Sequence, residues 1–253
     1  MIADPVAQAR SPGMANTLLQ ERGQFGAFVL LPMQVPAGAL REVIAGLRQV
    51  QSFAGAIVSM PHKTAIVPLL DELTSEAQLV GAVNVIARSS AGRLVGTVLD
   101  GEGFVAGMRS AGHEVEGASC LLVGAGGAAA AIAFALARHG CASLTIENRT
   151  PSKATSLATR VRAAFPDVRV QVGDPGGRYD IAINATSLGM KADDELPLSR
   201  DAIERTALVA ECVVAPEFTP LLEAAREKGR AIHTGVPMLT AQMDLILRFM
   251  GVV

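Results

Sequence analysis

A glycine-rich turn between a buried strand and a helix constrains this chain more than any other feature. The apolar run 120–123 leads into Gly124-Ala125-Gly126-Gly127-Ala128-Ala129, and an alanine-rich helical stretch follows. A strand, GxGxxA and a helix in this order are typical of the first βα unit of a doubly wound sheet that binds a dinucleotide. Gly124 permits the tight turn, Gly126 lets the backbone approach a pyrophosphate, and Ala129 allows the helix to pack close to the strand. The helix N-terminus offers free N–H groups to that anion. If the turn binds a dinucleotide, the candidate cofactor-binding residues are Gly124, Ala125, Gly126, Gly127 and Ala128. The alternative is an ordinary βα turn that binds no cofactor.

Short β-like runs alternate with helical patterns along the rest of the chain. Before the glycine turn, apolar spacing predicts strands at 27–31 and 56–58, helices at 36–50, 64–73 and 101–111, and a hairpin of 83–88 with 93–98. After it, we expect strands at 144–146, 168–170, 181–183 and 208–210. One helix is expected to begin at Thr150-Pro151, and three more are expected at 201–205, 220–228 and 237–250. Alternation of this kind predicts an α/β fold whose parallel sheet is covered on both faces. A domain boundary is expected between Asp100 and Gly112, where the hairpin ends.

Charge and composition exclude several classes of function. Half of the 253 residues are apolar and 18% are charged, so the chain can bury a core large enough for one or two domains. Its 22 basic and 24 acidic side chains leave no basic excess for nucleic acid. No secretion signal opens the chain and no apolar run is long enough to span a bilayer, so we expect a cytoplasmic protein without a membrane partner. Cys120, Cys141 and Cys212 form no CxxC and are expected to be buried free thiols.

The tip of the second strand after the glycine turn bears on the choice between NAD and NADP. NAD sites usually place a carboxylate there, on the ribose 2′-OH. Glu147 is near, but strand alternation turns it to the face opposite Asn148, which falls where the ribose contact is expected. Arg149, the hydroxyl of Thr150, and Lys153 one helical turn later suit a 2′-phosphate. The pattern favours NADP, with two alternatives: that Arg149 and Lys153 are only surface charges, or that Glu147 selects NAD.

Nine short motifs in a fixed order resemble the shikimate dehydrogenase family and cover nearly the whole chain. They are Ser11-Pro12 with Asn16, Ser59 to Lys63, Gly81 to Asn84, Asp100 to Phe104, the glycine turn, Asn148 to Thr150, Asn184 to Met190, Thr219 to Leu222, and Gly235 to Gln242. The resemblance implies an N-terminal α/β substrate domain, 1–100, joined by the C-terminal helix 237–253, and a C-terminal Rossmann-type NADP-binding domain, 101–236. It also implies a small alicyclic substrate and a monomer or homodimer.

The same resemblance assigns roles to individual residues. Lys63 matches the family's catalytic lysine and Asp100 its aspartate partner. Substrate-binding positions are matched by Ser11, Ser59, Asn84 and Gln242. The expected cofactor site, which includes Asn148, Arg149, Thr150 and Lys153, is completed by Thr186, Ser187, Met190 and Gly235.

Several positions depart from the family pattern. Ala9 stands where a second carboxylate-binding serine is expected, Gln8 replaces the preceding histidine, Val98-Leu99 replaces Asn-Thr, and Val214 replaces a tyrosine. Polar groups of the expected pocket have therefore become apolar, and we expect poor affinity for shikimate. Only residues 1–3 precede Asp4-Pro5, so most of the family's first strand is expected to be missing, either because the start codon is placed too late or because the domain has an abbreviated edge.

Lys63 and Asp100 suit the chemistry that the resemblance implies. Reduction of a ketone needs a proton on oxygen as well as a hydride on carbon. The Lys63 ammonium can donate that proton, and Asp100 would orient the amine and stabilise its charge. His62 is expected to be structural because strand alternation turns it away from Lys63. The remaining histidines are scattered at the ends of predicted elements, so no metal site is expected: His113, His139 and His233.

The resemblance favours the first of three functions and leaves the other two as alternatives. The first is an NADP-dependent oxidoreductase that interconverts 3-dehydroshikimate and shikimate. The second is a paralogue that acts on quinate, an aminoshikimate-like compound or another small alicyclic hydroxy acid. The third is an NADP-binding protein with little turnover, which would bind the cofactor without any dependence on Lys63.

Overall fold

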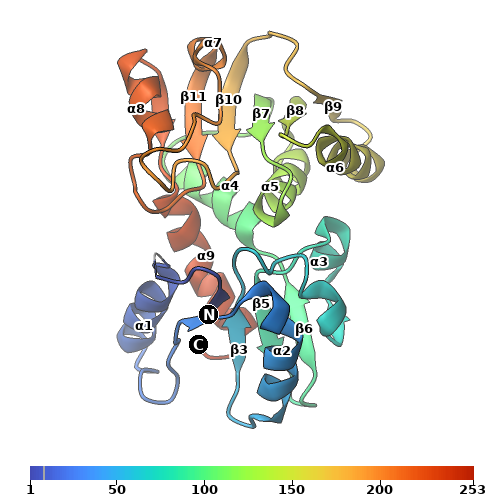
Figure 1. Ribbon diagram of the computed structural model, residues 1–253, viewed down its shortest axis with the longest axis vertical. Helices are drawn as coiled ribbons and strands as arrows, with labels where there is room; N and C mark the ends of the chain where they lie inside the picture. Colours follow the sequence, from blue (N-terminus) through green and yellow to red (C-terminus); the bar gives the residue numbers. More distant parts are fainter. Residues whose placement is uncertain (8) are drawn as a thin grey trace. The chain divides into compact units, whose positions relative to one another are not determined.

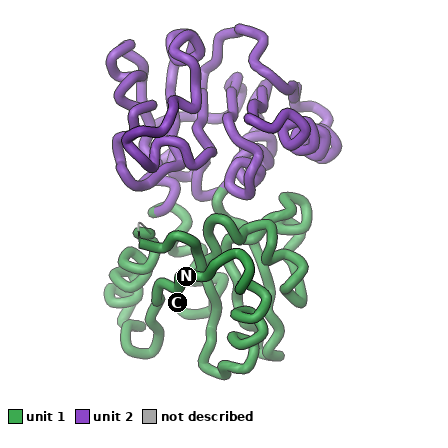
Figure 2. Tube along the Cα trace, viewed as in Figure 1, with its two compact units in different colours: residues 1–100, 240–253 green, residues 101–239 purple. Residues whose placement is uncertain are grey.

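The chain folds into two compact units, shown in Figures 1 and 2. The computed structural model describes residues 1–7 and 9–253. Unit 1 comprises Met1–Asp100 and Thr240–Val253, and unit 2 comprises Gly101–Leu239. The chain passes from unit 1 to unit 2 at the start of helix α4 (Asp100–Ser110) and returns within helix α9 (Val236–Phe249).

Unit 2 is built on a sheet of six parallel strands. They are β7 (Ser119–Val123), β8 (Ser143–Glu147), β9 (Arg169–Val172), β10 (Tyr179–Asn184), β11 (Thr206–Glu211) and β12 (Ala231–His233). Their order in the sheet is β12-β11-β10-β7-β8-β9. Strands β10, β11 and β12 thus extend to one side of β7, and β8 and β9 extend to the other, which is the order of a Rossmann-type sheet. Ligands of such sheets bind at the carboxyl ends of the strands where the direction reverses, here between β7 and β10.

Two pairs of helices accompany this sheet (Figure 1). Helices α5 (Gly127–Arg138) and α6 (Pro151–Ala164) pack together, and so do α7 (Arg200–Glu204) and α8 (Pro220–Glu227). Right-handed crossovers place the two pairs on opposite faces of the sheet. The predicted parallel sheet with helices on both faces is therefore confirmed. Helix α5 buries all of residues 129–137, and its many alanines let it lie close to the strands.

Unit 1 contains a mixed sheet of four strands in the order β3-β5-β6-β4. These are β3 (Gly55–Ile57), β4 (Glu72–Leu73), β5 (Val85–Arg88) and β6 (Leu94–Thr97). The predicted hairpin is confirmed, because β5 and β6 pair antiparallel. Two short parallel strands, β1 (Ile2–Ala3) and β2 (Met33–Gln34), lie beside it through a bridge between Ile2 and Val58. The remaining helices of unit 1 are α1 (Ser11–Glu21), α2 (Leu40–Gln49) and α3 (Ser75–Val80).

The strand predicted at 27–31 is wrong. The strand of this region is β2, which begins two residues after the end of the predicted strand and is only two residues long. The side chain of Asn16 occupies both hydrogen-bonding groups of Leu30: it donates to the carbonyl at 3.0 Å and accepts from the N–H at 2.8 Å. A side-chain amide thus replaces a neighbouring strand, and Val29 and Leu31 remain exposed.

The helix predicted at 64–73 is also wrong. Only a 3₁₀ turn, Val67–Leu69, forms there, and it is followed by strand β4. Pro68 explains the difference, because proline lacks an N–H and its ring obstructs the preceding turn of an α-helix. The other predicted helices form within a few residues of their expected ends. Among the described residues, no helix has the length and apolar character needed to cross a bilayer.

Candidate active site

Lys63 and Asp100 form an ion pair in unit 1. Lys63 Nζ donates to Asp100 Oδ2. The Asp100 carboxylate is buried and lies in the first turn of α4, where the helix dipole favours negative charge. The Lys63 carbonyl accepts a bond from the N–H of Val83 at 2.7 Å, which fixes the lysine beside the segment that leads into β5. An ammonium has three donors, and this pairing uses one of them.

Two buried amides extend the pair into a four-residue cluster. Asn84 Nδ2 donates to Asp100 Oδ1 and to Gln242 Oε1, both at 3.0 Å. Asn84 Oδ1 accepts from the N–H of Leu99 at 2.8 Å, so the residue before Asp100 is held as well. Asp100, Asn84 and Gln242 are at most 4% exposed, whereas 16% of the Lys63 side chain is exposed. The cluster therefore buries the partners of Lys63 and leaves the lysine as its most accessible member.

The other predicted substrate-binding residues lie on different segments of unit 1. Ser11 is buried as the first residue of α1, and Ser59 is half-buried directly after Val58. Ala9 lines a hollow of about 640 Å³ between α1 and α9. No member of the Lys63 cluster lines this hollow, whose walls are Ala9, Arg10, Gly13, Met14, Thr17, Leu18, Glu21, Thr240 and Met243. Gln8, expected in place of a histidine, lies outside the described residues.

The predicted glycine turn has a steric basis in unit 2. Gly124 has φ +124°, and a Cβ there would lie 2.7 Å from the carbonyl oxygen of Ala185. Any side chain would separate the ends of β7 and β10. Gly126 differs, because a Cβ there would meet nothing within 4 Å. The space beside Gly126 is open to a ligand, and α5 begins at the next residue with the free N–H groups of its first turn.

The tip of β8 lies next to this turn. The N–H of Gly124 donates to the carbonyl of Glu147 at 2.8 Å. Beyond it, Arg149, Thr150 and Lys153 are exposed, as a phosphate site requires. Two observations add detail to the sequence prediction, in which Thr150 is the N-cap. The amide of Asn148 donates to the Thr150 carbonyl at 3.0 Å, and Thr150 occupies the N-cap of α6 without a capping bond from its side chain within the described chain.

The turn after β10 is organised by Asn184. Its Oδ1 accepts from the N–H and the hydroxyl of Thr186, at 3.0 and 2.7 Å, and its Nδ2 donates to the Leu188 carbonyl at 2.9 Å. These bonds fix the backbone of the predicted cofactor segment; Ser187 is exposed and Met190 is half-buried. Gly235 approaches a neighbouring strand end closely, since a Cβ there would lie 2.3 Å from the Val213 carbonyl oxygen.

Glu211 is a buried residue that the sequence reasoning missed. It ends β11, is fully buried, and accepts bonds from Asn184 Nδ2, the Thr219 hydroxyl, and the N–H groups of Cys212 and Val213, all between 2.8 and 3.1 Å. Burial raises its pKa, and these bonds oppose the rise. Glu211 therefore joins the turns after β10 and β11. The sequence feature that could have pointed to Glu211 is a carboxylate directly after the apolar run 208–210.

The histidines and cysteines behave partly as expected. The His62 ring is buried and bonds the Val35 carbonyl at 2.7 Å, which agrees with a structural role. Cys120 and Cys141 are buried free thiols, whereas Cys212 is only partly buried. His113 and His233 are not scattered: their rings meet edge to face with centroids 5.7 Å apart. In the described part of the chain, no three His, Cys, Asp or Glu side chains gather as metal ligands would.

Comparison with known proteins decides the family. The model of the shikimate dehydrogenase substrate-binding domain matches residues 1–86, and that of shikimate/quinate 5-dehydrogenase matches residues 107–189. A shikimate dehydrogenase (NADP⁺) from Rubrobacter xylanophilus is 39% identical over 96% of this chain and 86% of its own length. The chain belongs to the shikimate dehydrogenase family.

Solved structures share this fold across the chain. The shikimate dehydrogenase of Thermus thermophilus, in complex with NADP(H) and shikimate, is 30% identical, has a TM-score of 0.84, and covers 100% of this chain and 92% of its own. The ligand-free 5-ketofructose reductase of a Gluconobacter strain is 29% identical with a TM-score of 0.82, and covers 98% of this chain and 90% of its own. The architecture is therefore that of shikimate dehydrogenases, with an N-terminal substrate domain and a Rossmann-type domain.

Proposed function

We propose that this protein is an NADP-dependent dehydrogenase that interconverts 3-dehydroshikimate and shikimate. The Lys63–Asp100–Asn84–Gln242 cluster carries this proposal. It holds an ammonium at the edge of a buried polar group, where it can give a proton to a carbonyl oxygen. Family membership supports the same reaction.

Asp100 and Asn84 determine what Lys63 can do. The carboxylate pairs with the ammonium of Lys63 and orients it as a proton donor. Asn84 donates to the other oxygen of Asp100 and keeps the carboxylate oriented toward the lysine. In the reverse reaction, the neutral amine takes the proton back from the substrate hydroxyl.

Unit 2 supports NADP as the cofactor. The open space at Gly126 and the first turn of α5 suit the pyrophosphate, and exposed Arg149, Thr150 and Lys153 suit the 2′-phosphate. When bound, NADPH supplies the hydride that reduces the carbonyl carbon. This chain would hold both phosphate groups at the carboxyl ends of adjacent parallel strands, the pyrophosphate after β7 and the 2′-phosphate after β8.

Lys63→Ala tests the assignment. Loss of the proton donor should lower turnover of shikimate by about two to four orders of magnitude and leave NADP binding unchanged. Lys228→Ala, at an exposed lysine of α8's C-terminus, is the matched control and should retain full activity. Unchanged turnover in Lys63→Ala would reject the proton donor. An absence of turnover in the parent protein, with NADP bound, would favour a cofactor-binding protein.

A second candidate rests on Ala9 and Val214, where the family pattern has a serine and a tyrosine. Fewer donors for a carboxylate favour a substrate that lacks one, and a relative of similar fold is named 5-ketofructose reductase. Assays of shikimate and quinate with NADP⁺ and NAD⁺, and of 5-ketofructose with NADPH and NADH, separate these substrates. The one with the highest kcat/KM identifies the class.

A further inference from the structure

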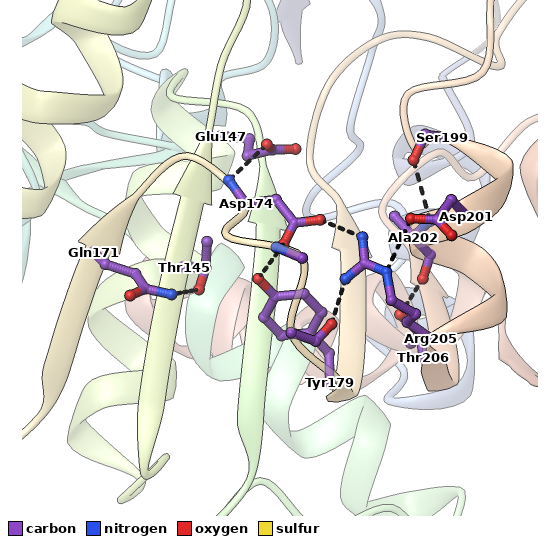
Figure 3. A network of polar contacts seen from close by, with 12 residues as sticks. Thr145, Glu147, Gln171, Asp174, Tyr179, Ser199, Asp201, Ala202, Arg205 and Thr206 are labelled. Atoms are coloured by element: carbon purple, nitrogen blue, oxygen red, sulfur yellow. Dashed lines mark hydrogen bonds and ion pairs between the residues drawn. The ribbon is translucent and has the colours of Figure 1, made fainter.

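A polar network surrounds Asp174, in the loop between β9 and β10 of unit 2 (Figure 3). Asp174 Oδ1 accepts from the Tyr179 hydroxyl at 2.7 Å and from the N–H of Gly176 at 2.8 Å. Its Oδ2 accepts from Arg205 Nη2, also at 2.7 Å. Arg205 also donates to the carbonyl of Gly177, three residues after Asp174 in the same loop. The carboxylate thus fixes its own loop to the start of β10 and to the residue before β11.

The backbone of Asp174 binds the carboxylate of Glu147. Its N–H donates to Glu147 Oε1 at 2.9 Å, and Figure 3 shows the glutamate directed toward the loop. Glu147 ends β8, and its carbonyl bonds the N–H of Gly124 in the glycine turn. It therefore occupies the strand tip from which dinucleotide-binding folds direct an acid to the ribose 2′-OH of NAD. Here that acid is engaged by the neighbouring loop.

The network is charged and stable at neutral pH. Burial raises the pKa of Asp174, but the bonds from Arg205 and Tyr179 outweigh burial and lower it overall, so the carboxylate is ionised. Burial raises the pKa of Tyr179 to about 12, so its hydroxyl remains a donor. Asp174 therefore keeps its acceptor oxygens and Tyr179 its donor at neutral pH, so the contacts between the loop and its neighbours are retained.

We propose that Asp174 is a positioning residue for cofactor choice: by fixing its loop, it keeps the Glu147 carboxylate away from the adenosine ribose and so favours NADP over NAD. The inference rests on the proposed use of NADP. A released Glu147 would accept a bond from the 2′-OH of NAD and repel the 2′-phosphate of NADP, which Arg149 attracts. Both effects lower the preference for NADP.

A double-mutant cycle tests the proposal in the full-length protein. The dissociation constants of NADP⁺ and NAD⁺ are measured for the parent protein, Glu147→Gln, Asp174→Ala and the double variant. Asp174→Ala should lower the NADP:NAD preference by about tenfold or more, the size of one charge-assisted contact. Glu147→Gln alone should change it less than about threefold, and the double variant should return to the parent value within the same margin.

Two further variants keep the result interpretable. Asp174→Asn retains the side-chain shape and shifts the preference in the same direction if Asp174→Ala fails to fold. Asp201→Asn is the control, because Asp201 also bonds Arg205, at 3.1 Å, but is exposed and lies outside the loop. It should leave the preference unchanged.

The outcomes of these experiments distinguish a failure of the role proposed for Asp174 from a failure of the proposed use of NADP. An unchanged preference in folded Asp174→Ala and Asp174→Asn, or an equal loss when Glu147 is already glutamine, overturns the role of Asp174. A large gain of NADP affinity in Glu147→Gln alone also overturns it, because Glu147 would then already face the ribose. A parent protein that prefers NAD instead contradicts the proposed use of NADP.

Discussion

Lys63 owes its position to the backbone on both sides of it. The N–H of Ser59 bonds the Ile2 carbonyl at 2.9 Å, and the Lys63 carbonyl is held by Val83. The ring of His62 anchors the intervening turn on Val35. The lysine thus lies on a short segment tied to β1, to the loop before α2 and to the approach to β5. A flexible four-carbon side chain reaches one defined partner because its backbone has little freedom.

Family motifs predict each member of the Lys63 cluster, but spacing alone could not join them. Lys63, Asn84, Asp100 and Gln242 come from segments up to 179 residues apart, 242 minus 63. Only the fold shows that Asn84 bridges Asp100 and Gln242. The network around Asp174 was not predicted at all, because its members carry no motif and meet only where two loops approach each other.

Arg149→Ala should change the cofactor preference. A lost charge-assisted bond to the 2′-phosphate weakens NADP⁺ binding by about tenfold to a hundredfold, while NAD⁺ binding, which lacks that group, stays nearly constant. Titration of both cofactors measures the two constants. Arg200→Ala removes an exposed arginine from the start of α7 and serves as the control. Equal losses for NADP⁺ and NAD⁺ would show that Arg149 is structural.

Ala9→Ser should improve shikimate binding. A serine hydroxyl there would restore one donor for the substrate carboxylate, and KM for shikimate should fall by about an order of magnitude. Val214→Tyr should act in the same direction. Steady-state kinetics give both values, and Ala7→Ser on the exposed turn two residues earlier is the control. A parent enzyme with a low KM for shikimate, or reversions without effect, would remove Ala9 and Val214 from the account of specificity.

At the scale of elements, the doubly wound sheet follows directly from sequence pattern. Buried parallel strands are continuous apolar runs, and each predicted run of unit 2 becomes a strand. Prediction fails in unit 1, where Asn16 satisfies Leu30 and where Pro68 interrupts a helical pattern. Hydrophobic spacing reports which face is buried. It does not report that a side-chain amide replaces a strand partner, so the structure of short, irregular segments cannot be predicted from hydrophobic spacing.

Glu211 should contribute to the free energy of unfolding, because its carboxylate joins the turns after β10 and β11. In Glu211→Ala, the amide of Asn184 and the N–H groups of Cys212 and Val213 lose a buried acceptor, so the free energy of unfolding should fall by about 2–4 kcal/mol. In Glu211→Gln, one amide oxygen still accepts from these donors, and the Thr219 hydroxyl can turn to accept from the amide nitrogen. Because burial already favours the neutral acid, this variant should lose less than about 1 kcal/mol. Urea unfolding compares the two, and similar losses would contradict the acceptor role.

At the scale of the whole molecule, both passages of the chain between units meet inside unit 2. Gly107 of α4 lies against Pro237 at the start of α9, since a Cβ on Gly107 would be 2.7 Å from the carbonyl carbon of Pro237. The His233 ring packs nearby on Phe104 of α4, with centroids 6.3 Å apart, and on His113. His233 is 3% exposed, and among the described residues its Nε2 has no hydrogen-bond partner. The junction of α4 and the start of α9 therefore contains a buried histidine, and its burial favours the neutral ring.

His233 should make the protein sensitive to acid. Burial, and secondarily the charge of His113, lowers its pKa from 6.5 to about 4. Between these values the unfolded chain takes up a proton that the folded protein does not, so the free energy of unfolding decreases as pH falls through this window and loses nothing more from His233 below about pH 4. The full loss is about 3 kcal/mol. Urea unfolding of the parent and of His233→Leu, from about pH 7 to about pH 4, isolates this contribution because the carboxylates titrate alike in both. The stability difference between the two proteins should shift in favour of the leucine variant as pH falls, and parallel curves would show that His233 accepts a proton without disturbing the junction of α4 and α9.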